Sequence, residues 1–423
     1  MVRLTAGWRE TARQASLREH MDRFGPLPLR GHRRGQQQRL AETVANAGLT
    51  GRGGAGFPTG TKMRAVAAQR GGAVVLANGM ESEPASSKDE ALLAFAPHLV
   101  LDGAVLAAEA VGASTVHLCL SRLQPGLARQ LRAAVSERAG TDQVPVKVHE
   151  VPHHYVASEE TALVCWLNGG EAKPVMTPPR PAERGVRRLP TLVGNVETLA
   201  HVALIARYGP AWFRQAGLPD APGTMLVTVS GAVSCPGVRE VEVGTTVGEV
   251  LTLSGAADSS GSVLIGGYFG SWHDRGTVAQ VPLTASHLRP FGGSPGAGVL
   301  IALPGTACGL AETAGVLAFL AGQGAGQCGP CTFGLPAIAE DFAQLAAGRA
   351  GEGVFARLER RLGTVRGRGA CRHPDGAVRL AASALATFAA DAHAHARRRP
   401  CAAARQRTPL TLPAVASADE GWR

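Results

Sequence analysis

Long hydrophobic runs are missing from this chain of 423 residues. No segment offers eighteen uninterrupted apolar residues, which argues against a membrane-spanning helix. The first residues, MVRLTAGWRETARQ, include basic side chains but no apolar core, so they do not resemble a secretory signal. Cysteine is also sparse. Eight cysteines with a C-x-x-C pair favour a reducing compartment and a metal or redox role over a disulfide framework. We therefore expect a cytoplasmic protein.

Lysine is nearly absent, and arginine supplies almost all of the net charge of +10. The lysines are Lys62, Lys88, Lys147 and Lys173. Arginines are scattered through the chain and concentrate in its tail, from Arg397 onward. No zinc-finger spacing or RNP motif accompanies them. The excess of positive charge therefore predicts an acidic protein partner rather than nucleic acid.

The two common nucleotide-binding patterns are also missing. The chain has no G-x-x-x-x-G-K-[ST], and GRGGAG does not have the spacing of G-x-G-x-x-G. It has instead GLTGRGGAGFPTGTK, from Gly48 to Lys62. Such a loop lets the backbone approach a ligand and present N–H groups to an anion, while Arg52 and Lys62 add positive charge. The loop predicts a flat, phosphate-bearing cofactor; the alternative is a glycine-rich surface turn.

Short β-rich runs alternate with alanine-rich helical stretches between residues 47 and 220. Residues 73–78 and 115–120 read as strands, and residues 98–113 read as a helix. This alternation predicts an α/β layer structure with a partly parallel sheet. The acidic run NGMESEP directly follows the first strand. Ligand-binding residues are expected at that end of a strand in an open α/β sheet.

The rest of the chain divides by composition. Residues 1–46 are a polar lead-in with a helical pattern at 40–47. Residues 221–299 read as short strands around a helix that starts at Thr246. Residues 300–396 are mostly helical, with helices expected at Ala311–Ala321, Leu335–Ala347 and Ala377–His395. The basic tail, residues 397–423, is expected to be disordered.

Several long motifs occur in an order that resembles a known family. The Gly51–Lys62 loop is similar to the flavin loop of the NADH-oxidising subunit of respiratory complex I, shared with NAD-linked hydrogenases and formate dehydrogenases. Asn78–Pro84 (NGMESEP) is similar to N-x-D-E-x-E-P, and Tyr155–Ala162 (YVASEETA) to Y-I-C-G-E-E-T-A. Pro190–Thr198 (PTLVGNVET) and Gly326–Gly334 (GQCGPCTFG) resemble P-T-x-x-N-N-V-E-T and G-Q-C-T-P-C-R-x-G. The resemblance runs from about Leu17 to about His395.

The resemblance implies an FMN-binding α/β domain at 47–220, a β-grasp-like SLBB module at 221–299 and a helical iron–sulfur bundle at 300–396. It assigns the following residues to the flavin: Gly51, Arg52, Gly53, Gly54, Lys62, Asn78, Glu81, Ser158, Glu159, Glu160, Asn195 and Thr198. It places Phe57, Glu83 and Tyr155 at the NADH site. Taken singly, each is also explained as a surface polar residue, and Glu159 and Glu160 as a solvated helix start.

The chain departs from the family in the nucleotide pocket. Ala65 and Arg180 stand where the family has phenylalanine, Thr177 stands where it has lysine, and Met80 replaces an aspartate. Losing a stacked aromatic ring costs roughly 1 kcal/mol or more. NADH affinity is therefore in question. One hypothesis is that Arg180 meets the 2′-phosphate of NADPH.

The cluster motif also departs. Cys328, Cys331 and Cys371 match three ligands of a [4Fe–4S] cluster, but the first ligand position is Ala325. The incomplete set leaves several alternatives: a labile four-iron cluster, a three-iron cluster, zinc completed by His373, or no metal at all. Cys308 is the nearest spare thiol, and nothing in the spacing places it at the site.

The resemblance implies that a reduced nicotinamide passes a hydride to FMN. Electrons then reach the cluster and a ferredoxin-like iron–sulfur partner, and a position at the periphery of a membrane complex is left open. One alternative is an FMN electron-transfer module that no longer binds NADH and exchanges electrons with a ferredoxin. Another is a scaffold that keeps only the fold. Reduction of a bound flavin by NADH or NADPH separates the first two hypotheses.

Overall fold

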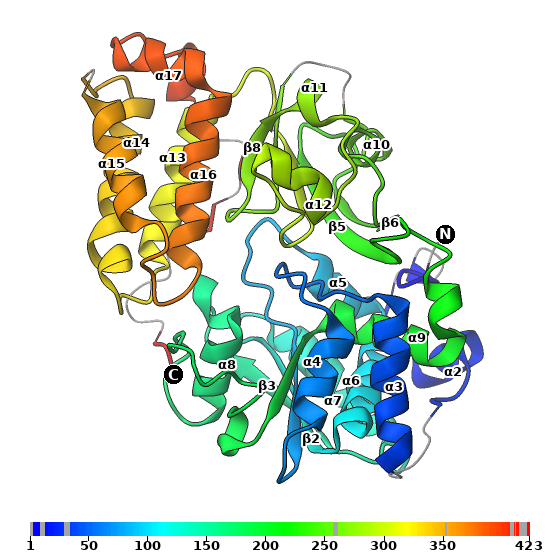
Figure 1. Ribbon diagram of the computed structural model, residues 1–423. Coiled ribbons are helices and arrows are strands. Elements are labelled where there is room, and N and C mark those ends of the chain that lie inside the picture. The colour runs from blue at the N-terminus through cyan, green and yellow to red at the C-terminus, as the bar shows by residue number, and fades with distance from the viewer. Residues whose placement is uncertain are drawn as a thin grey trace.

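The computed structural model describes residues 3–8, 13–28, 34–256, 261–351, 353–406, 410, 412–413 and 421–423, with side chains of α3 described from residue 39. Figure 1 shows three bodies: an α/β layer structure below, a smaller module of strands at upper right and a helical region at upper left. The expected combination of an α/β domain, a strand-rich module and a C-terminal helical region is therefore confirmed.

The α/β body is built on four parallel strands in the order β3-β2-β1-β4. Their bounds are β1 (Ala73–Asn78), β2 (Ala113–Ser121), β3 (Val146–Val151) and β4 (Thr191–Asn195). Side chains of β1 alternate between the faces: Val75 and Ala77 join one hydrophobic cluster, and Val74 and Leu76 join another. Both faces are covered, as a parallel sheet requires.

Helices cover this sheet on both sides. They are α2 (Leu17–Phe24), α3 (Arg34–Ala47), α4 (Thr59–Ala67), α5 (Lys88–Phe95), α6 (Pro97–Val111), α7 (Pro125–Glu137), α8 (Glu160–Leu167) and α9 (Val196–Phe213). Every residue of α6 is buried, which explains its nearly continuous apolar sequence. Within the described ranges, no single helix has the length and apolar composition to cross a membrane; α5 and α6 together meet those criteria but are bent by 97°.

A second sheet has the order β6-β5-β9-β7-β8. Its strands are β5 (Thr224–Gly231), β6 (Gly237–Glu242), β7 (Ser262–Ile265), β8 (Ser271–Asp274) and β9 (Val299–Ala302), with helices α10 (Val247–Leu253), α11 (Arg275–Val278) and α12 (Ala285–Leu288). Thr246 caps α10 in a capping box with Glu249, as its position predicts. Because β9 pairs with β5 and β7, the sheet extends to Ala302, beyond the boundary expected at 299. We call residues 224–302 the five-stranded module.

The helical region consists of α13 (Gly309–Gly322), the short π-helix η4 (Pro330–Gly334), α14 (Leu335–Ala346), α15 (Val354–Val365), α16 (His373–Thr387) and α17 (Ala389–Ala396). The expectation of one helix over Ala377–His395 is wrong, because the backbone leaves helical geometry at Phe388. Phe388 packs on Trp272 with ring centroids 5.4 Å apart, and a Cβ on Gly309 would lie 2.1 Å from it. Tertiary packing therefore accompanies a break that the alanine-rich sequence does not predict.

Described residues of the basic tail are packed, in contrast to the disorder expected for it. Leu410 is buried, and its N–H donates to Glu312 at 3.1 Å. Trp422 stacks on His154 with ring centroids 3.8 Å apart, and its carbonyl accepts from the N–H of Ala172 at 2.8 Å. Leu410 and Trp422 remove apolar surface from water, which favours an ordered tail at these positions. Residues 407–409, 411 and 414–420 lie outside the described part of the chain.

Candidate functional site

The carboxyl ends of β1 and β4 bring Asn78 and Asn195 together, since these two residues are register partners. The chain continues to β2 on one side of β1 and reaches β4 on the other, so this is the point where the strand order reverses. Open α/β sheets bind ligands in the crevice at such a point. Asn195 caps α9 by accepting from the N–H of Glu197 at 3.0 Å, and its Nδ2 donates to Asp89 at 2.6 Å. Two expected flavin residues thus lie where an open α/β sheet has its ligand crevice.

The glycine-rich loop folds over this crevice. It closes on itself where the N–H of Gly51 donates to Phe57 and the N–H of Thr59 donates to Leu49, both at 2.9 Å. A Cβ on Gly53 would lie 3.2 Å from the Cβ of Asn195, closer than most real contacts. Gly54 has φ of +101°, which side chains rarely adopt. The loop therefore requires glycine for its close approach and its turn.

Arg52 lies in this loop but directs its guanidinium inward. Its side chain donates to the hydroxyl of Thr50 at 3.1 Å and to the carbonyl of Pro222 at 3.4 Å. Burial lowers the pKa of Arg52. Its backbone N–H donates to the Thr198 hydroxyl at 2.8 Å, which ties the loop to the first turn of α9. In this conformation Arg52 and Thr198 anchor the loop.

Lys62 and Glu160 form a half-exposed ion pair beside the loop. The Lys62 Nζ lies 2.7 Å from a carboxylate oxygen of Glu160. Glu159 differs from its neighbour because it caps α8, accepting from the N–H groups of Thr161 and Ala162 at 2.8 and 3.2 Å. Burial raises the pKa of Glu159. The two adjacent glutamates are therefore not equivalent: Glu159 shapes the helix start, and Glu160 neutralises Lys62.

Glu81 is engaged by the start of α5. Its carboxylate accepts from the N–H groups of Asp89 at 3.2 Å and Glu90 at 2.9 Å, and from the hydroxyl of Ser86. Burial raises the pKa of Glu81 to about 7, and the charge of Asp89 adds to the shift, while Lys88 opposes it. Glu81 thus orders the segment below the crevice.

A buried ion network supports these residues from beneath. Lys88 lies 2.6 Å from Asp89 and 2.8 Å from Glu197, and all three are buried. Burial opposes the charge of Lys88, but Asp89 and Glu197 together raise its pKa. Glu197 also accepts from the N–H of Leu226 at 2.8 Å, which joins α9 to β5. The sequence motifs did not mark Lys88 or Glu197 as site residues, although Lys88 is one of only four lysines.

The short helix η1 (Tyr155–Ser158) faces the crevice from the end of β3. The carbonyl of Ser158 accepts from Asn78 at 2.9 Å. The Tyr155 hydroxyl donates to Glu83 at 2.6 Å, and Glu83 also accepts from the N–H of Tyr268 at 2.9 Å. Burial raises the pKa of Glu83, whereas these hydrogen bonds lower it. Expected flavin and nucleotide residues therefore meet in one hydrogen-bonded unit.

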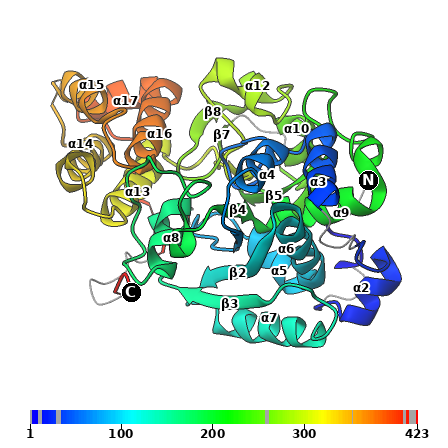
Figure 2. The same cartoon turned by 60° about the horizontal axis from the view of Figure 1, so that its bottom comes forward.

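The same segment contacts the helical region. The N–H of Tyr155 donates to Gln323 at the end of α13 at 2.9 Å, and its ring lies 5.8 Å from that of His373. Glu159 acts electrostatically on the thiol of Cys371. Figure 2 shows α8 and the C-terminal residues between the four-stranded sheet and the helical region. Residues 155–159 therefore bridge the crevice and the cysteines, which the sequence did not predict.

The three expected cluster cysteines share one electrostatic neighbourhood. Cys331 is buried in η4, and Cys328 and Cys371 are half-buried. Burial raises the pKa of Cys331 to about 12, with further contributions from Cys328 and Cys371. Among the described residues these three sulfurs do not all lie within 4.8 Å of one another. Thiolates around one tetrahedral zinc lie about 3.8 Å apart, so these three sulfurs are not arranged as a complete set of zinc ligands in this conformation.

His373 does not complete a zinc site with these cysteines. It is buried, and its Nε2 donates to the carbonyl of Leu320 at 2.8 Å. Burial lowers the pKa of His373 to about 4, so the ring is neutral. Its position supports α13 against α16, and the zinc alternative loses its fourth ligand in this conformation.

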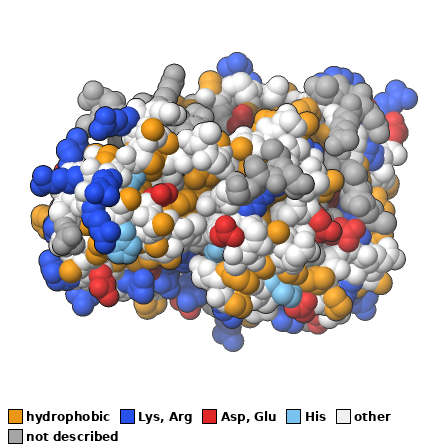
Figure 3. Space-filling view, turned by 90° about the horizontal axis from the view of Figure 1, so that it is seen from above, with side chains coloured by type: hydrophobic (Ala, Val, Ile, Leu, Met, Phe, Trp, Pro, Cys, Tyr) orange, Lys and Arg blue, Asp and Glu red, His pale blue; other side chains and the backbone are white. Residues whose placement is uncertain are grey.

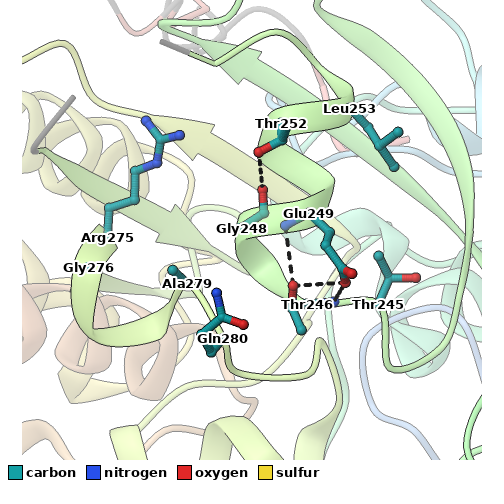
Figure 4. A pocket seen from close by; sticks show the side chains of 10 residues that line it. All are labelled: Thr245, Thr246, Gly248, Glu249, Thr252, Leu253, Arg275, Gly276, Ala279 and Gln280. Atoms are coloured by element: carbon teal, nitrogen blue, oxygen red, sulfur yellow. Dashed lines mark hydrogen bonds between the residues drawn. The ribbon is translucent and has the colours of Figure 1, made fainter. Parts of the chain in front are cut away.

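A separate groove of about 740 Å³ lies on the five-stranded module. Figure 4 shows its walls, with the side chain of Arg275 on one side, Gln280 below, and Thr246 and Glu249 joined by the capping box of α10. None of the expected flavin, nucleotide or cluster residues lines it. The candidate site at the strand ends and the glycine-rich loop is therefore separate from this groove.

Two family models match the chain. One, described as the Nuo51 FMN-binding domain, covers residues 44–204, which include the glycine-rich loop, the strand ends and η1. The other, described as the NADH-ubiquinone oxidoreductase-F iron-sulfur binding region, covers residues 307–395, which include the three cysteines.

Curated relatives match over most of the chain. The second F-type subunit of the NADH-quinone oxidoreductase of Rhizobium meliloti is 30% identical over 378 residues, covering 86% of this chain and 90% of the relative. The F-type subunit of the Streptomyces coelicolor enzyme is 31% identical over 383 residues, covering 86% of this chain and 84% of the relative. The alpha subunit of the NAD-reducing hydrogenase HoxS of Cupriavidus necator is 38% identical over 236 residues, covering 52% of this chain and 39% of the relative.

Solved structures of an NAD⁺-reducing [NiFe]-hydrogenase have the same fold. The chain from the H2-reduced state aligns with a TM-score of 0.79 at 31% identity, over 87% of this chain and 64% of that chain. The chain from the air-oxidised state aligns with a TM-score of 0.82 at 29% identity, over 99% of this chain and 70% of that chain.

Proposed function

Since the chain belongs to the family of F-type subunits of NADH-quinone oxidoreductase, we propose that it is an FMN-dependent protein that oxidises a reduced nicotinamide and passes electrons through an iron–sulfur cluster to a partner protein. The observation that carries the proposal is the bridge at residues 155–159. This segment contacts Asn78 in the crevice, Gln323 in the helical region and, electrostatically, Cys371. The segment places the two sites next to each other, and sequential electron transfer requires such proximity.

The crevice fits FMN. The loop from Gly53 to Gly56 is exposed and almost free of side chains, and Lys62 lies beside it. Asn78, Asn195 and Ser158 would hold the flavin from the strand ends. Lys62 would pair with its phosphate by exchanging its partner Glu160. When bound, FMN supplies two-electron chemistry with nicotinamides and one-electron chemistry with clusters. The chain's own residues orient it, and none needs to act as an acid or base.

The nucleotide pocket keeps only part of its aromatic lining. Phe57 is 49% exposed, so its ring is available for stacking. Ala65 and Arg180 are also exposed, and neither supplies a ring. This observation favours the second candidate function, an FMN module that is reduced by another redox protein. Glu83 and Tyr155, joined by a hydrogen bond, support the first candidate because they keep the family's polar wall.

The helical region fits a cluster held by three thiolates. Cys328, Cys331 and Cys371 would hold it, and a non-protein ligand would complete the set at the position of Ala325. Ala325 is half-buried, so a thiol there would be partly shielded. We expect the Ala325→Cys variant to retain iron longer than wild type under a chelator, measured as iron per chain over time. Equal loss from both proteins would contradict the three-thiolate cluster. Ala370→Cys provides a matched control near Cys371.

We propose that the partner docks over the cluster. Phe333, two residues after Cys331, is 74% exposed. Exposed arginines are numerous on the helical region: Arg349, Arg360, Arg366, Arg368, Arg372, Arg379, Arg397, Arg398 and Arg399. Figure 3 shows Lys and Arg side chains gathered along the left edge, over this region. An apolar contact among positive charges suits an acidic iron–sulfur protein such as a ferredoxin.

The deciding experiment is an anaerobic visible spectrum of the purified protein with NADH and then NADPH. Bleaching of the flavin bands on mixing supports nicotinamide oxidation. Bands that persist until dithionite is added support the second candidate, and absence of flavin would reject both. Arg180→Ala, with Arg184→Ala as the matched control, tests the NADPH hypothesis: a loss of NADPH reactivity in Arg180→Ala alone would support it.

A further inference from the structure

Two cysteines outside the cluster motif meet a histidine in the helical region. The ligand atoms of Cys308, His395 and Cys401 all lie within 4.8 Å of one another. Cys308 precedes α13, His395 lies in α17 and Cys401 follows six residues later, so two distant parts of the chain meet. Cys401 also lies beyond the matched iron–sulfur binding region, which ends at residue 395.

The imidazole is fixed in the orientation of a ligand. His395 is fully buried, and its Nδ1 donates to the carbonyl of Ala346 at 2.9 Å. The proton is thereby held on Nδ1, so Nε2 carries a lone pair, which accepts from the N–H of Cys401 at 3.0 Å. A backbone carbonyl on the far ring nitrogen is the usual support of a metal-binding histidine.

The sulfurs are also placed to bind a metal ion. Cys308 is 2% exposed, and the N–H groups of Leu310 and Ala311 at the start of α13 donate toward its sulfur. Burial outweighs these donors and raises the pKa of the Cys308 thiol to about 12, so a thiolate there needs a bound cation. The sulfur of Cys401 lies within 4.8 Å of that of Cys308, and Cys401 is half-buried. Two thiolates would neutralise a divalent cation, so the complete site is neutral and can be buried.

We propose that Cys308, His395 and Cys401 bind one zinc ion, with water in the fourth position. Two sulfurs and one imidazole nitrogen are ligands that zinc prefers, at about 2.3 and 2.0 Å. The sulfurs of such a site lie about 3.8 Å apart, so the group would contract on binding. The Nε2 of His395 would exchange its hydrogen bond from the N–H of Cys401 for the metal ion. The ion would fasten the tail to the starts and ends of the helices, next to the point where Leu410 packs on α13. The site is independent of the flavin crevice and of the cluster cysteines.

The test is metal analysis of the full-length protein, purified with a reductant and equilibrated with one equivalent of ZnCl2 before dialysis. We expect about one zinc per chain in wild type and in Cys235→Ser, an exposed-cysteine control. Cys401→Ser should lose the zinc while its iron and flavin contents stay unchanged, which shows that it folds. Cys371→Ser should lose iron and keep zinc, which separates this site from the cluster.

Zinc K-edge X-ray absorption of the wild type gives a readout that needs no variant. Two sulfur ligands and one nitrogen ligand are expected. A dialysed wild type without zinc, equal zinc in wild type and Cys401→Ser, or a Cys308–Cys401 disulfide recovered in place of the metal would each overturn the proposal.

Discussion

At the scale of single residues, Glu83 is a half-buried residue whose carboxylate accepts hydrogen bonds from near and distant parts of the chain. Tyr155 and the N–H groups of Tyr268 and Ala85 all donate to it. Burial raises its pKa above the unfolded value of about 4.3. A raised pKa means that the protonated carboxyl stabilises the fold below the unfolded pKa, and that this contribution is lost as pH rises through the folded pKa.

Tyr155→Phe should increase the stability that the protein loses when Glu83 ionises. Without the hydroxyl, the ionised Glu83 loses a charge-assisted hydrogen bond, so we expect a destabilisation of about 2 kcal/mol at pH 8 and a smaller one at pH 4. Denaturant unfolding at the two pH values measures the difference. Tyr208→Phe, at a 43% exposed tyrosine, should stay near wild type at both. An equal effect of Tyr155→Phe at both pH values would contradict the role of the Tyr155–Glu83 bond.

Restoring rings in the nucleotide pocket should tighten NADH binding. We expect Ala65→Phe and Arg180→Phe each to lower the Kd for NADH about fivefold, corresponding to roughly 1 kcal/mol of stacking. Titration of the oxidised protein with NAD⁺ or anaerobic titration with NADH measures this. Arg184→Phe, at an exposed position on the same segment, should leave the Kd unchanged. No gain in either pocket variant would show that these positions do not face the nucleotide.

At the scale of elements, one buried aspartate joins four helical segments. Asp102 of α6 lies 2.7 Å from His20 of α2 and 2.7 Å from Arg138 at the end of α7, and it also pairs with Arg207 of α9. Burial alone would raise its pKa, but His20 and the two arginines lower the pKa of Asp102 to about 2. The carboxylate therefore stabilises the packing of these helices.

Asp102→Asn should cost about 3–5 kcal/mol at pH 7, because it leaves buried arginines without a counter-charge. Folding lowers the pKa of Asp102, so the ionised Asp102 stabilises the wild-type protein above the unfolded pKa of about 3.9. This stabilisation is lost as pH falls toward about 2. The two proteins should therefore converge in stability between about pH 4 and pH 2. Glu150→Gln, which breaks the exposed Arg132–Glu150 pair, should cost less than about 1 kcal/mol. A pH-independent difference would contradict this assignment.

At the scale of the whole molecule, the net charge of +10 and the exposed arginines of the helical region should steer an acidic partner. We expect the rate of ferredoxin reduction to fall several-fold between about 0.05 and 0.3 M salt, because the Debye length shortens. Reduction of an uncharged quinone should not change. Arg368→Glu should lower the ferredoxin rate, whereas Arg129→Glu, on α7, should not. Salt-independent ferredoxin reduction would contradict an acidic partner.

The sequence by itself determined the fold class, and it named candidate site residues that stay predictions. The alternation of β-rich and alanine-rich runs predicted the parallel sheet. Each β-rich run is long enough to form a strand buried on both faces, and each alanine-rich run is long enough to form a helix that covers the sheet. The glycines around Gly53 were recognisable because such a loop lets the backbone approach a ligand, and the asparagines at the strand ends were recognisable only from the family resemblance. Cys328, Cys331 and Cys371 were recognisable from their spacing and resemblance.

Only the tertiary structure decided which side chains meet. The inward turn of Arg52, the bridge at Tyr155 and the burial of Lys88 against Glu197 depend on contacts between segments far apart in the chain. The break at Phe388 accompanies packing on Trp272, which local helix propensity cannot reveal. Cys308, His395 and Cys401 have no recognisable spacing, because separate helix ends and the tail bring them together. Local patterns record what each segment can form, whereas long-range packing selects the neighbours on which the chemistry depends.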